Sequence, residues 1–381
     1  MKNFPLIGLG IATVGASGKT LDTFFPCISF KDSEDEFSHH YEIWNALMAE
    51  NVTEIKNVDQ LNLQNEILNN VISNLDKDKS LILCRILENK PIETVEEAYL
   101  KLHLISYKHF VPNSLNLENL FDSLQNVAWT SHGPIELDDI DKRILLSHKN
   151  NESLEIKSVD KFPCLTDYII PPGVRIGDAS RVRLGAYLSE GTTVMHEGFV
   201  NFNAGTLGPA MIEGRISAGV VVGKNSDLGG GCSTMGTLSG GNDVKISIGE
   251  NCLLGANSGL GIPLGDNCII EAGLYITGGS KITTYNSNNG EVAVELGNRR
   301  VAYRLVDDLH LDAARRVVPS VDEAVLLHHV RAVGVRVVGR EGPEREHEQE
   351  AEGEGGDEAV RYPGLVPAQE PRGLLVSLPD R

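Results

Sequence analysis

The stretch Ile246–Gly279, ISIGENCLLGANSGLGIPLGDNCIIEAGLYITGG, carries aliphatic residues six positions apart. The full series is Ile170, Ile176, Val182, Leu188, Val194, Val200, then Val222, Leu228, then Ile248, Leu254, Leu260 and, after a four-residue step, Leu264, Ile270, Ile276, Ile282. Neither the helical period of 3.6 nor the strand period of 2 produces this spacing. A period of six indicates a hexapeptide-repeat parallel β-helix, in which each unit forms one flat side of a coil and its aliphatic residue points to the axis.

Two Gly-rich, polar segments interrupt the series, Asn201–Ala218 and Thr234–Lys245. Insertions in a solenoid form loops on one face, and such loops often carry the functional site. The sequence therefore predicts two insertion loops, the first of which contains Glu213.

The regions on either side of the repeat have different compositions. Residues 1–161 predict a mixed α/β domain, with helices over Asp59–Leu75 and Thr94–Tyr107 and a strand over Ser80–Leu87. The β-helix is expected over residues 162–284. Residues 285–381 are predicted to form an atypical, irregular C-terminal region, partly of low complexity, since twelve of the eighteen Arg lie there and none of the sixteen Lys. This shift indicates foreign or frame-shifted coding, or a lineage-specific extension.

Composition limits the partners and the compartment. The formal net charge of −19 argues against a nucleic-acid or anionic-membrane partner, because such surfaces need clustered Lys and Arg. No stretch has the apolar length of a membrane span or the pattern of a secretory signal. The six cysteines form no CxxC pair, which favours free thiols in a reducing cytoplasm.

Long blocks of the chain resemble the longer-chain type of tetrahydrodipicolinate N-succinyltransferase. These blocks are WTSHGPI (Trp129–Ile135), RIGDASRVRLGAYLSEGTTVMHEGFVNFNAGTLG (Arg175–Gly208), MIEGRISAGVVVG (Met211–Gly223), GGGCSTMGTLSGG (Gly229–Gly241) and Ile246–Gly279. The resemblance implies a left-handed β-helix, a homotrimer with sites between subunits, and succinyl transfer from succinyl-CoA to the amine of tetrahydrodipicolinate. Succinyl-CoA is then a co-substrate, and no tightly bound cofactor is expected.

Glu213 matches the family's catalytic glutamate, which would act as a nucleophile or as a base toward the amine. Arg215 matches a position that contacts succinyl-CoA, and a guanidinium suits a carboxylate or a phosphate. Small or polar residues match positions that line the groove for substrate and CoA. They are Gly230, Ser233, Ala256, Glu271, Ala272 and Gly279.

Glu197 matches a position at the three-fold axis where the family can bind Mg²⁺. The Asp that usually accompanies it one coil earlier is replaced here by Ser180. The family's basic segment after the last coil, which completes the CoA site, has only a weak counterpart in GNRRVAYR (Gly297–Arg304).

Two alternatives stay open on the residues alone. One is a hexapeptide acyltransferase that uses acetyl-CoA or another acyl donor, with His196 as the base. The other is a non-catalytic β-helix protein. A carbonic-anhydrase-like site is disfavoured because His196 is the only His between Asn150 and Asp308.

Overall fold

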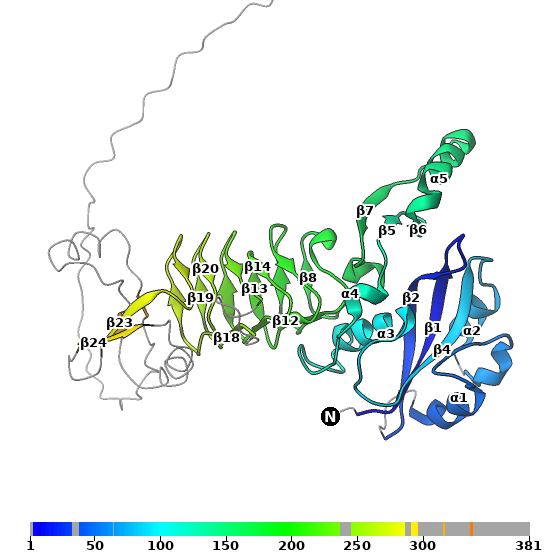
Figure 1. The fold of residues 1–381 in the computed structure, drawn as a ribbon, viewed down its shortest axis with the longest axis horizontal. Helices are drawn as coiled ribbons and strands as arrows, with labels where there is room; N and C mark the ends of the chain where they lie inside the picture. Colours follow the sequence, from blue (N-terminus) through cyan, green and yellow to red (C-terminus); the bar gives the residue numbers. More distant parts are fainter. Residues whose placement is uncertain are drawn as a thin grey trace, which may run out of the picture. The chain divides into compact units, whose positions relative to one another are not determined.

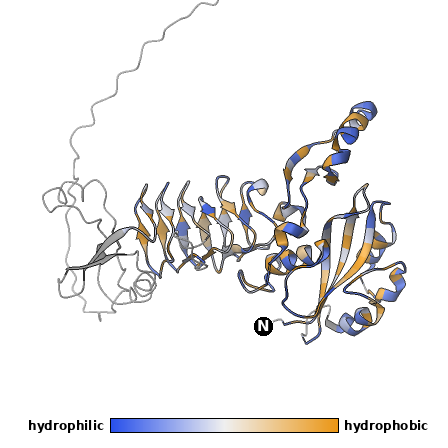
Figure 2. Cartoon of the chain, in the orientation of Figure 1, coloured by the Kyte–Doolittle hydropathy of each residue, from blue (hydrophilic) through white to orange (hydrophobic). Residues whose placement is uncertain are grey.

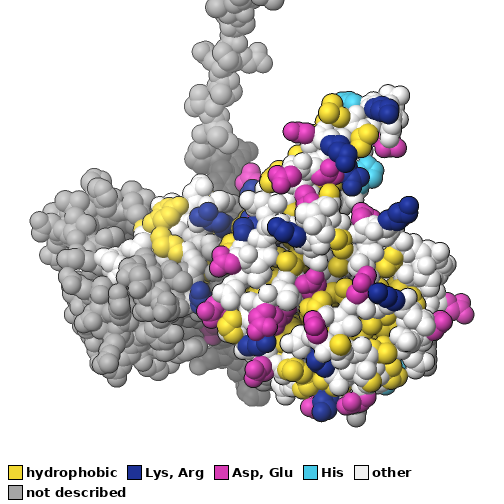
Figure 3. Space-filling model, turned by 45° about the vertical axis from the view of Figure 1, so that its right-hand side comes forward, with side chains coloured by type: hydrophobic (Ala, Val, Ile, Leu, Met, Phe, Trp, Pro, Cys, Tyr) yellow, Lys and Arg dark blue, Asp and Glu magenta, His cyan; other side chains and the backbone are white. Residues whose placement is uncertain are grey.

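The computed structural model describes residues 3–32, 38–63, 65–236, 245–285, 291–295, 315–316 and 336–337. The chain divides into two units, Met1–Arg340 and Glu341–Arg381, and every described residue lies in the first. Most of the predicted irregular C-terminal region therefore lies outside the described residues. No helix among the described residues is long and apolar enough to span a bilayer. On the face in Figure 3, basic and acidic side chains are interspersed rather than gathered in separate patches.

The N-terminal part is a four-stranded sheet in the order β2-β1-β4-β3, covered by helices on both faces (Figure 1). The strands are β1 (Leu6–Val14), β2 (Thr20–Phe30), β3 (Val52–Glu54) and β4 (Lys79–Ile86), all paired antiparallel. Figure 2 shows the hydrophobic residues that recur along β1 and β4. Because side chains alternate between faces, Leu9 and Leu83 pack against one helical layer while Ile82 and Ile86 pack against the other.

One layer consists of α3 (Val95–Ser106), which confirms the predicted helix over Thr94–Tyr107. Thr94 caps it, because its hydroxyl accepts a hydrogen bond from Glu97 N at 3.1 Å. The strand predicted over Ser80–Leu87 is β4. The other layer holds α1 (Tyr41–Leu47), α2 (Glu66–Ser73) and the 3-10 helices Ser38–His40 and Val58–Leu61.

The prediction of one continuous helix over Asp59–Leu75 is wrong, because the structure has a 3-10 helix and a separate α-helix there. The first turn ends at Asn62, which has a left-handed backbone (φ 52°), and α2 begins only at Glu66 with Asn65 as its cap. A left-handed residue cannot continue a right-handed helix, so two short helices replace one. Val71, predicted on the apolar face, is 52% exposed.

A smaller module follows the short helix α4 (Leu120–Ser123). Its sheet has the order β6-β5-β7, with β5 (Val127–Thr130), β6 (Gly133–Glu136) and β7 (Ile156–Asp160). Helix α5 (Leu137–Asn150) connects β6 to β7 and has no buried residue. The 3-10 helices Leu165–Asp167 and Ala179–Arg181 lie near the start of the repeat.

The repeat folds into a parallel β-helix whose three flat sides are separate sheets, which confirms the predicted fold class (Figure 1). The first side has the order β8-β10-β13-β16-β19-β21, from strands Arg175–Ile176, Thr193–Val194, Ala210–Ile212, Ser226–Leu228, Leu253–Leu254 and Ile269–Ile270. The second is β11-β14-β17-β20-β22, from Phe199–Val200, Arg215–Ile216, Ser233–Thr234, Gly259–Leu260 and Tyr275–Ile276. The third is β9-β12-β15-β18, from Ala186–Leu188, Ala204–Thr206, Val221–Val222 and Ser247–Ile248.

Two antiparallel strand pairs follow the coils. The first joins β23 (Lys281–Tyr285) to β24 (Glu291–Glu295). The second joins β25 (Arg315–Arg316) to β26 (Arg336–Val337).

The aliphatic series forms the interior ladders from Ile176 to Ile276, and the side chain of Ile282 lies outside what the structure describes. Val194, Leu228, Leu254 and Ile270 are buried on the first side, as predicted, and Ile212 is stacked between Val194 and Leu228. Ile170 is wrong as the first rung: it is 75% exposed and precedes the first strand of the coils.

The first predicted insertion is also wrong, because residues 201–218 continue the coil through β12, β13 and β14. Thr206, Ile212 and Ile216 are fully buried rungs there. Thr206 hides the period because it is polar, and its hydroxyl is satisfied inside the coil by the Thr192 hydroxyl at 2.7 Å. A four-residue step from Ile212 to Ile216 then restores the register, as the step from Leu260 to Leu264 does later.

The β-helix begins against the N-terminal part. The Ser106 hydroxyl at the end of α3 donates to Ala186 O at 3.1 Å and accepts from Gly185 N at 2.8 Å. Asn113 N donates to Asn203 Oδ1 at 2.7 Å. Buried residues of both parts belong to one continuous core. The predicted division at residues 161 and 284 stays a prediction.

Candidate active site

The edge between the first and second sides of the β-helix carries most of the predicted site residues. We call it the glutamate edge; it consists of residues 195–198, 213–214, 229–232, 255–258 and 271–274, one corner from each of five successive coils. Backbone hydrogen bonds stack these corners: Gly231 N donates to Glu213 O at 3.4 Å, Asn257 N to Gly230 O at 2.9 Å and Gly273 N to Ala256 O at 2.9 Å. Glu197, Glu213, Gly230, Ala256, Glu271 and Ala272 therefore lie along one edge.

The corner at Glu213 is two residues shorter than its neighbours. Only Glu213 and Gly214 separate β13 from β14, whereas four residues form each of the corners above and below. Glu213 N donates to Leu228 O at 2.8 Å and Arg215 N to Cys232 O at 2.8 Å, so the backbone is held on both sides of the turn. The predicted insertion loop is thus a tight corner, and Glu213 is fixed by the coil rather than carried on a long loop.

Gly214 makes this short corner possible. A Cβ at this position would lie 2.3 Å from the Cys232 sulfur and 2.6 Å from Cys232 O. We expect Gly214→Ala to lower the free energy of unfolding by roughly 1–3 kcal/mol, the usual cost of overpacking a close-packed site. Thermal unfolding would measure it, with Gly279→Ala as the matched control because a Cβ there meets nothing within 4 Å. Equal melting temperatures for the two variants would contradict this prediction.

The Glu213 side chain is half-buried and lies over a run of glycines. A Cβ at Gly230 would be 3.8 Å from Glu213 Oε2, so the absence of a side chain there leaves the carboxylate accessible. The neighbouring thiol of Cys232 offers no second nucleophile: burial raises its pKa to about 12, and the thiol is protonated at neutral pH. Glu213 therefore presents the accessible carboxylate of this corner.

Arg215 and Ser233 lie on the second side of the coil, next to the glutamate edge. They are directly paired between β14 and β17, and Arg215 Nη2 donates to the Ser233 hydroxyl at 2.5 Å. No ion pair joins Arg215 to Glu213 in the part of the chain that the structure describes. The exposed guanidinium is thus held beside the edge with donors left for an anionic group.

Two coils further on, Tyr275 lies over Gly259 on this same side. The two residues are paired between β20 and β22, and a Cβ at Gly259 would meet the Tyr275 ring at 2.0 Å. Tyr275 is 57% exposed, so the column Arg215, Ser233, Gly259, Tyr275 presents a cation and an aromatic ring to solvent. Tyr275 is not among the site residues predicted from the sequence, although its place directly before the rung Ile276 is the outward position of a hexapeptide.

Gly279 lies apart from the other predicted residues. It follows β22 and occupies the opposite edge of the second side, between β22 and β23. The structure therefore brings Glu213, Gly230, Ala256, Glu271 and Ala272 together on one edge, with Arg215 and Ser233 adjoining, and leaves Gly279 on the far edge.

His196 and Glu197 occupy the corner one coil before Glu213, and both are exposed. His196 Nε2 is 3.9 Å from Glu197 Oε1, and Arg181 Nη2 donates to Glu197 O at 2.8 Å. Ser180, which replaces the family's Asp, donates to Asp178 Oδ1 at 2.7 Å.

A metal at Glu197 stays a prediction. Mg²⁺ requires several oxygen ligands in octahedral geometry. Among the described residues, no group of three or more His, Cys, Asp or Glu side chains could hold a metal ion.

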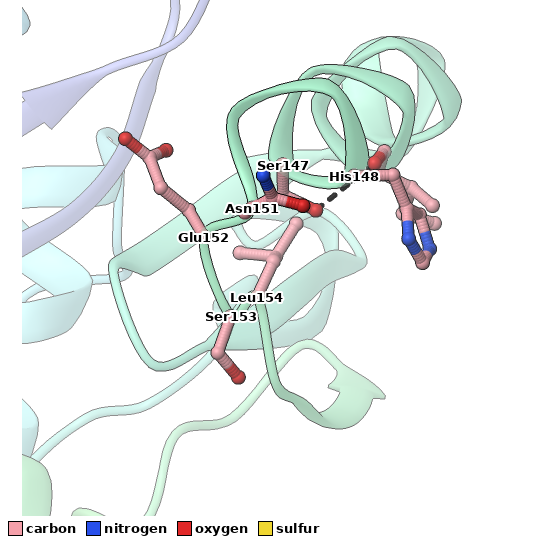
Figure 4. Close-up of a pocket in the computed structure, with 7 residues that line it drawn as sticks. Ser147, His148, Asn151, Glu152, Ser153 and Leu154 are labelled. Carbon is pink, nitrogen blue, oxygen red and sulfur yellow. Dashed lines mark hydrogen bonds between the residues drawn. The ribbon is translucent and has the colours of Figure 1, made fainter.

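Two hollows elsewhere contain none of the predicted site residues. One, of about 440 Å³, lies at the C-terminal end of α5, where Glu152 N donates to Ser147 O at 2.9 Å and Asn151 N to His148 O at 3.4 Å (Figure 4). These bonds, with Asn151 left-handed at φ 54°, are the usual closure of a helix end. The other, of about 330 Å³, borders the third side of the β-helix beside the ion pair of Lys224 and Glu250.

Stacked six-residue units on three parallel sheets define a hexapeptide-repeat β-helix protein. Residues 245–278 match the family model described as the hexapeptide repeat of succinyl-transferase, and residues 124–163 match tetrahydrodipicolinate N-succinyltransferase middle. The chain is 57% identical over 219 residues to the 2,3,4,5-tetrahydropyridine-2,6-dicarboxylate N-succinyltransferase of Pseudomonas aeruginosa, covering 58% of this chain. It is 55% identical over 207 residues to the protein of that name from Vibrio cholerae, covering 54% of this chain.

A crystal structure from Campylobacter jejuni, assigned as a 2,3,4,5-tetrahydropyridine-2-carboxylate N-succinyltransferase, matches with a TM-score of 0.66 and 36% identity. The match covers 75% of this chain and 81% of that one. The chain belongs to the tetrahydrodipicolinate N-succinyltransferase family. It spans 64% of the length of the Pseudomonas aeruginosa relative and 60% of the Vibrio cholerae relative.

Proposed function

We propose that the protein is an N-succinyltransferase that moves the succinyl group of succinyl-CoA to the amine of tetrahydrodipicolinate, as open-chain 2-amino-6-oxopimelate, in diaminopimelate and lysine biosynthesis. The observation that carries the proposal is the position of Glu213, fixed at the short corner with its carboxylate over Gly230. Family membership and the 57% identical relative support the substrate assignment.

The chemistry is acyl transfer to nitrogen. The amine attacks the thioester carbonyl, an N–C bond forms, the C–S bond breaks and the sulfur leaves with CoA. Glu213 either removes a proton from the attacking amine or first attacks the thioester itself to form an anhydride. Arg215, with its guanidinium anchored on Ser233, would bind the succinyl carboxylate or a CoA phosphate.

Gly230, Ala256, Glu271 and Ala272 would line the path of the substrates along the glutamate edge. Three of these four positions carry little or no side chain, so an extended CoA arm can lie close to the coil backbone. Gly279, at the opposite edge, would contact a more distant part of the same CoA molecule.

A thiol-release assay tests the function and its main alternative together. Purified protein should release CoA from succinyl-CoA only when tetrahydrodipicolinate is present, and far more slowly from acetyl-CoA. Faster release from acetyl-CoA would favour the other acyltransferase class, and no release from either donor would favour a non-catalytic β-helix.

We propose that the enzyme works as a homotrimer. Large apolar side chains are exposed on the outer surfaces of the coils: Leu207, Met211, Met235, Leu253 and Tyr275. A neighbouring subunit would cover them and complete the groove beside the glutamate edge. Light scattering at micromolar concentration should give about three times the chain mass of 41.4 kDa, and a monomer would contradict the proposal.

We also propose a cytoplasmic location. All six cysteines are free, and five of them are buried. Unpaired thiols are the usual state in a reducing compartment.

A further inference from the structure

A second carboxylate lies beside Glu213. Asp227 of β16 is paired with Met211 of β13, and Leu228 is paired with the inward-pointing Ile212. Because side chains alternate along these strands, Met211, Glu213 and Asp227 all face outward. The hydrogen bond from Glu213 N to Leu228 O continues the pairing of β13 with β16 as far as Glu213. Asp227 is paired with Met211, two residues before Glu213, so Asp227 is the diagonal neighbour of Glu213 on the adjacent coil.

The Asp227 carboxylate lies near that of Glu213, and neither is paired with a counter-charge among the described residues. Partial burial, followed by the nearby Glu213 carboxylate, raises the pKa of Asp227 above its ordinary value of 3.8. Across the described residues, neither side chain forms an ion pair or a hydrogen bond. Like charges on adjacent coils repel each other, so the pair should attract a cation from outside the chain.

The amine substrate supplies such a cation. Its amino group is an α-amino group, on the carbon that also carries a carboxylate, and such a group is an ammonium ion at neutral pH. We infer that Asp227 and Glu213 together bind the ammonium group of the amine substrate, with Asp227 as a second binding residue. This inference rests on the proposed function. Gly230 leaves the space beside the Glu213 carboxylate open to the ammonium, since a Cβ there would meet only Glu213 Oε2, at 3.8 Å.

The pair would fit the proton balance of the reaction with Glu213 as the base. Glu213 takes one proton from the ammonium, and the free amine attacks the thioester. As the C–S bond breaks, the second proton leaves with the sulfur, so the products are the amide, CoA thiol and protonated Glu213. Asp227 keeps a hydrogen bond to the nitrogen throughout and does not itself react.

Steady-state kinetics of Asp227→Asn test the inference. The KM for tetrahydrodipicolinate should rise roughly tenfold to a hundredfold, the usual effect of losing one hydrogen bond to a charged group. The KM for succinyl-CoA should stay unchanged, and kcat should change much less than the KM for the amine. Asp227→Glu, which restores the carboxylate, should recover part of the loss. Glu190→Gln removes the same charge from an exposed position away from the glutamate edge and should leave all three parameters unchanged.

The outcomes separate this inference from the function on which it rests. A wild-type protein without succinyl transfer would overturn both. An active wild type with an unchanged amine KM in Asp227→Asn would overturn only the role of Asp227. An equal rise in both KM values, without recovery in Asp227→Glu, would show a structural role and would also overturn it.

Discussion

Replacing Glu213 by Ala should lower kcat by roughly 10²–10⁴-fold, the range typical of losing a general base. The side chain is the accessible carboxylate of the short corner, and Cys232 beside it stays protonated, so neither the thiol nor the glycine run can replace it. Succinyl-CoA binding should persist, because Arg215 and Ser233 hold each other on β14 and β17 without help from Glu213.

Two comparisons sharpen this prediction. Glu213→Gln keeps the shape and removes the charge, and it should be nearly as inactive as Glu213→Ala. Incubating the wild type with succinyl-CoA alone, followed by mass spectrometry, distinguishes the two roles, since only a nucleophilic Glu213 would gain a succinyl group. A Glu213→Ala enzyme with near-normal kcat would show that the assignment is wrong, and His196 would be the next candidate.

The free energy of unfolding should fall by about 3 kcal/mol between pH 6.5 and pH 4, because the buried His103 resists protonation in the folded state. His103 lies in α3 without solvent exposure, and burial lowers its pKa from 6.5 to about 4. Between these values the unfolded chain binds the proton and the folded chain does not, so the free energy of unfolding falls as the pH falls. Each unit of pKa difference contributes about 1.4 kcal/mol.

The hydrogen bonds of His103 explain why the fold rejects the proton. Nδ1 lies 2.8 Å from Tyr99 O and donates to it, while Nε2 accepts from Phe25 N at 3.4 Å. A proton on Nε2 would face the Phe25 N–H, with two donors opposed in a buried site.

Denaturant unfolding of wild type and His103→Gln at pH 7 and pH 4 measures this effect. Gln can supply one donor and one acceptor but does not titrate, so its stability should fall less with acid than that of the wild type. His132→Gln, at an exposed position, is the control and should follow the wild type. Parallel losses in all three proteins would assign the acid sensitivity to groups other than His103. Asp22 is not such a group, because burial raises its pKa, and its protonation therefore favours the folded state.

The sequence by itself determined the β-helix, because the interior residues are aliphatic and recur every six positions, a spacing that can be seen without the structure. Val194, Leu228, Leu254 and Ile270 needed no knowledge of their partners to be assigned to the axis. The same local signal identified α3 and β4, where a cap and an apolar run mark the element. The candidate site residues came from likeness to a family, since no spacing rule marks a reactive carboxylate.

Only the tertiary structure decided where the coils continue and what surrounds Glu213. Thr206 is polar in the sequence but buried in the fold, because the neighbouring coil supplies a hydrogen-bond partner in Thr192. The four-residue step at Glu213 and Gly214 is a corner rather than a loop because Cys232, eighteen residues later, packs against it. Asp227 becomes a neighbour of Glu213 only when one coil stacks on the next. These features depend on contacts between residues far apart in the chain. A short stretch of sequence does not show which distant residues it will contact, so the stabilisation from such contacts cannot be predicted from it.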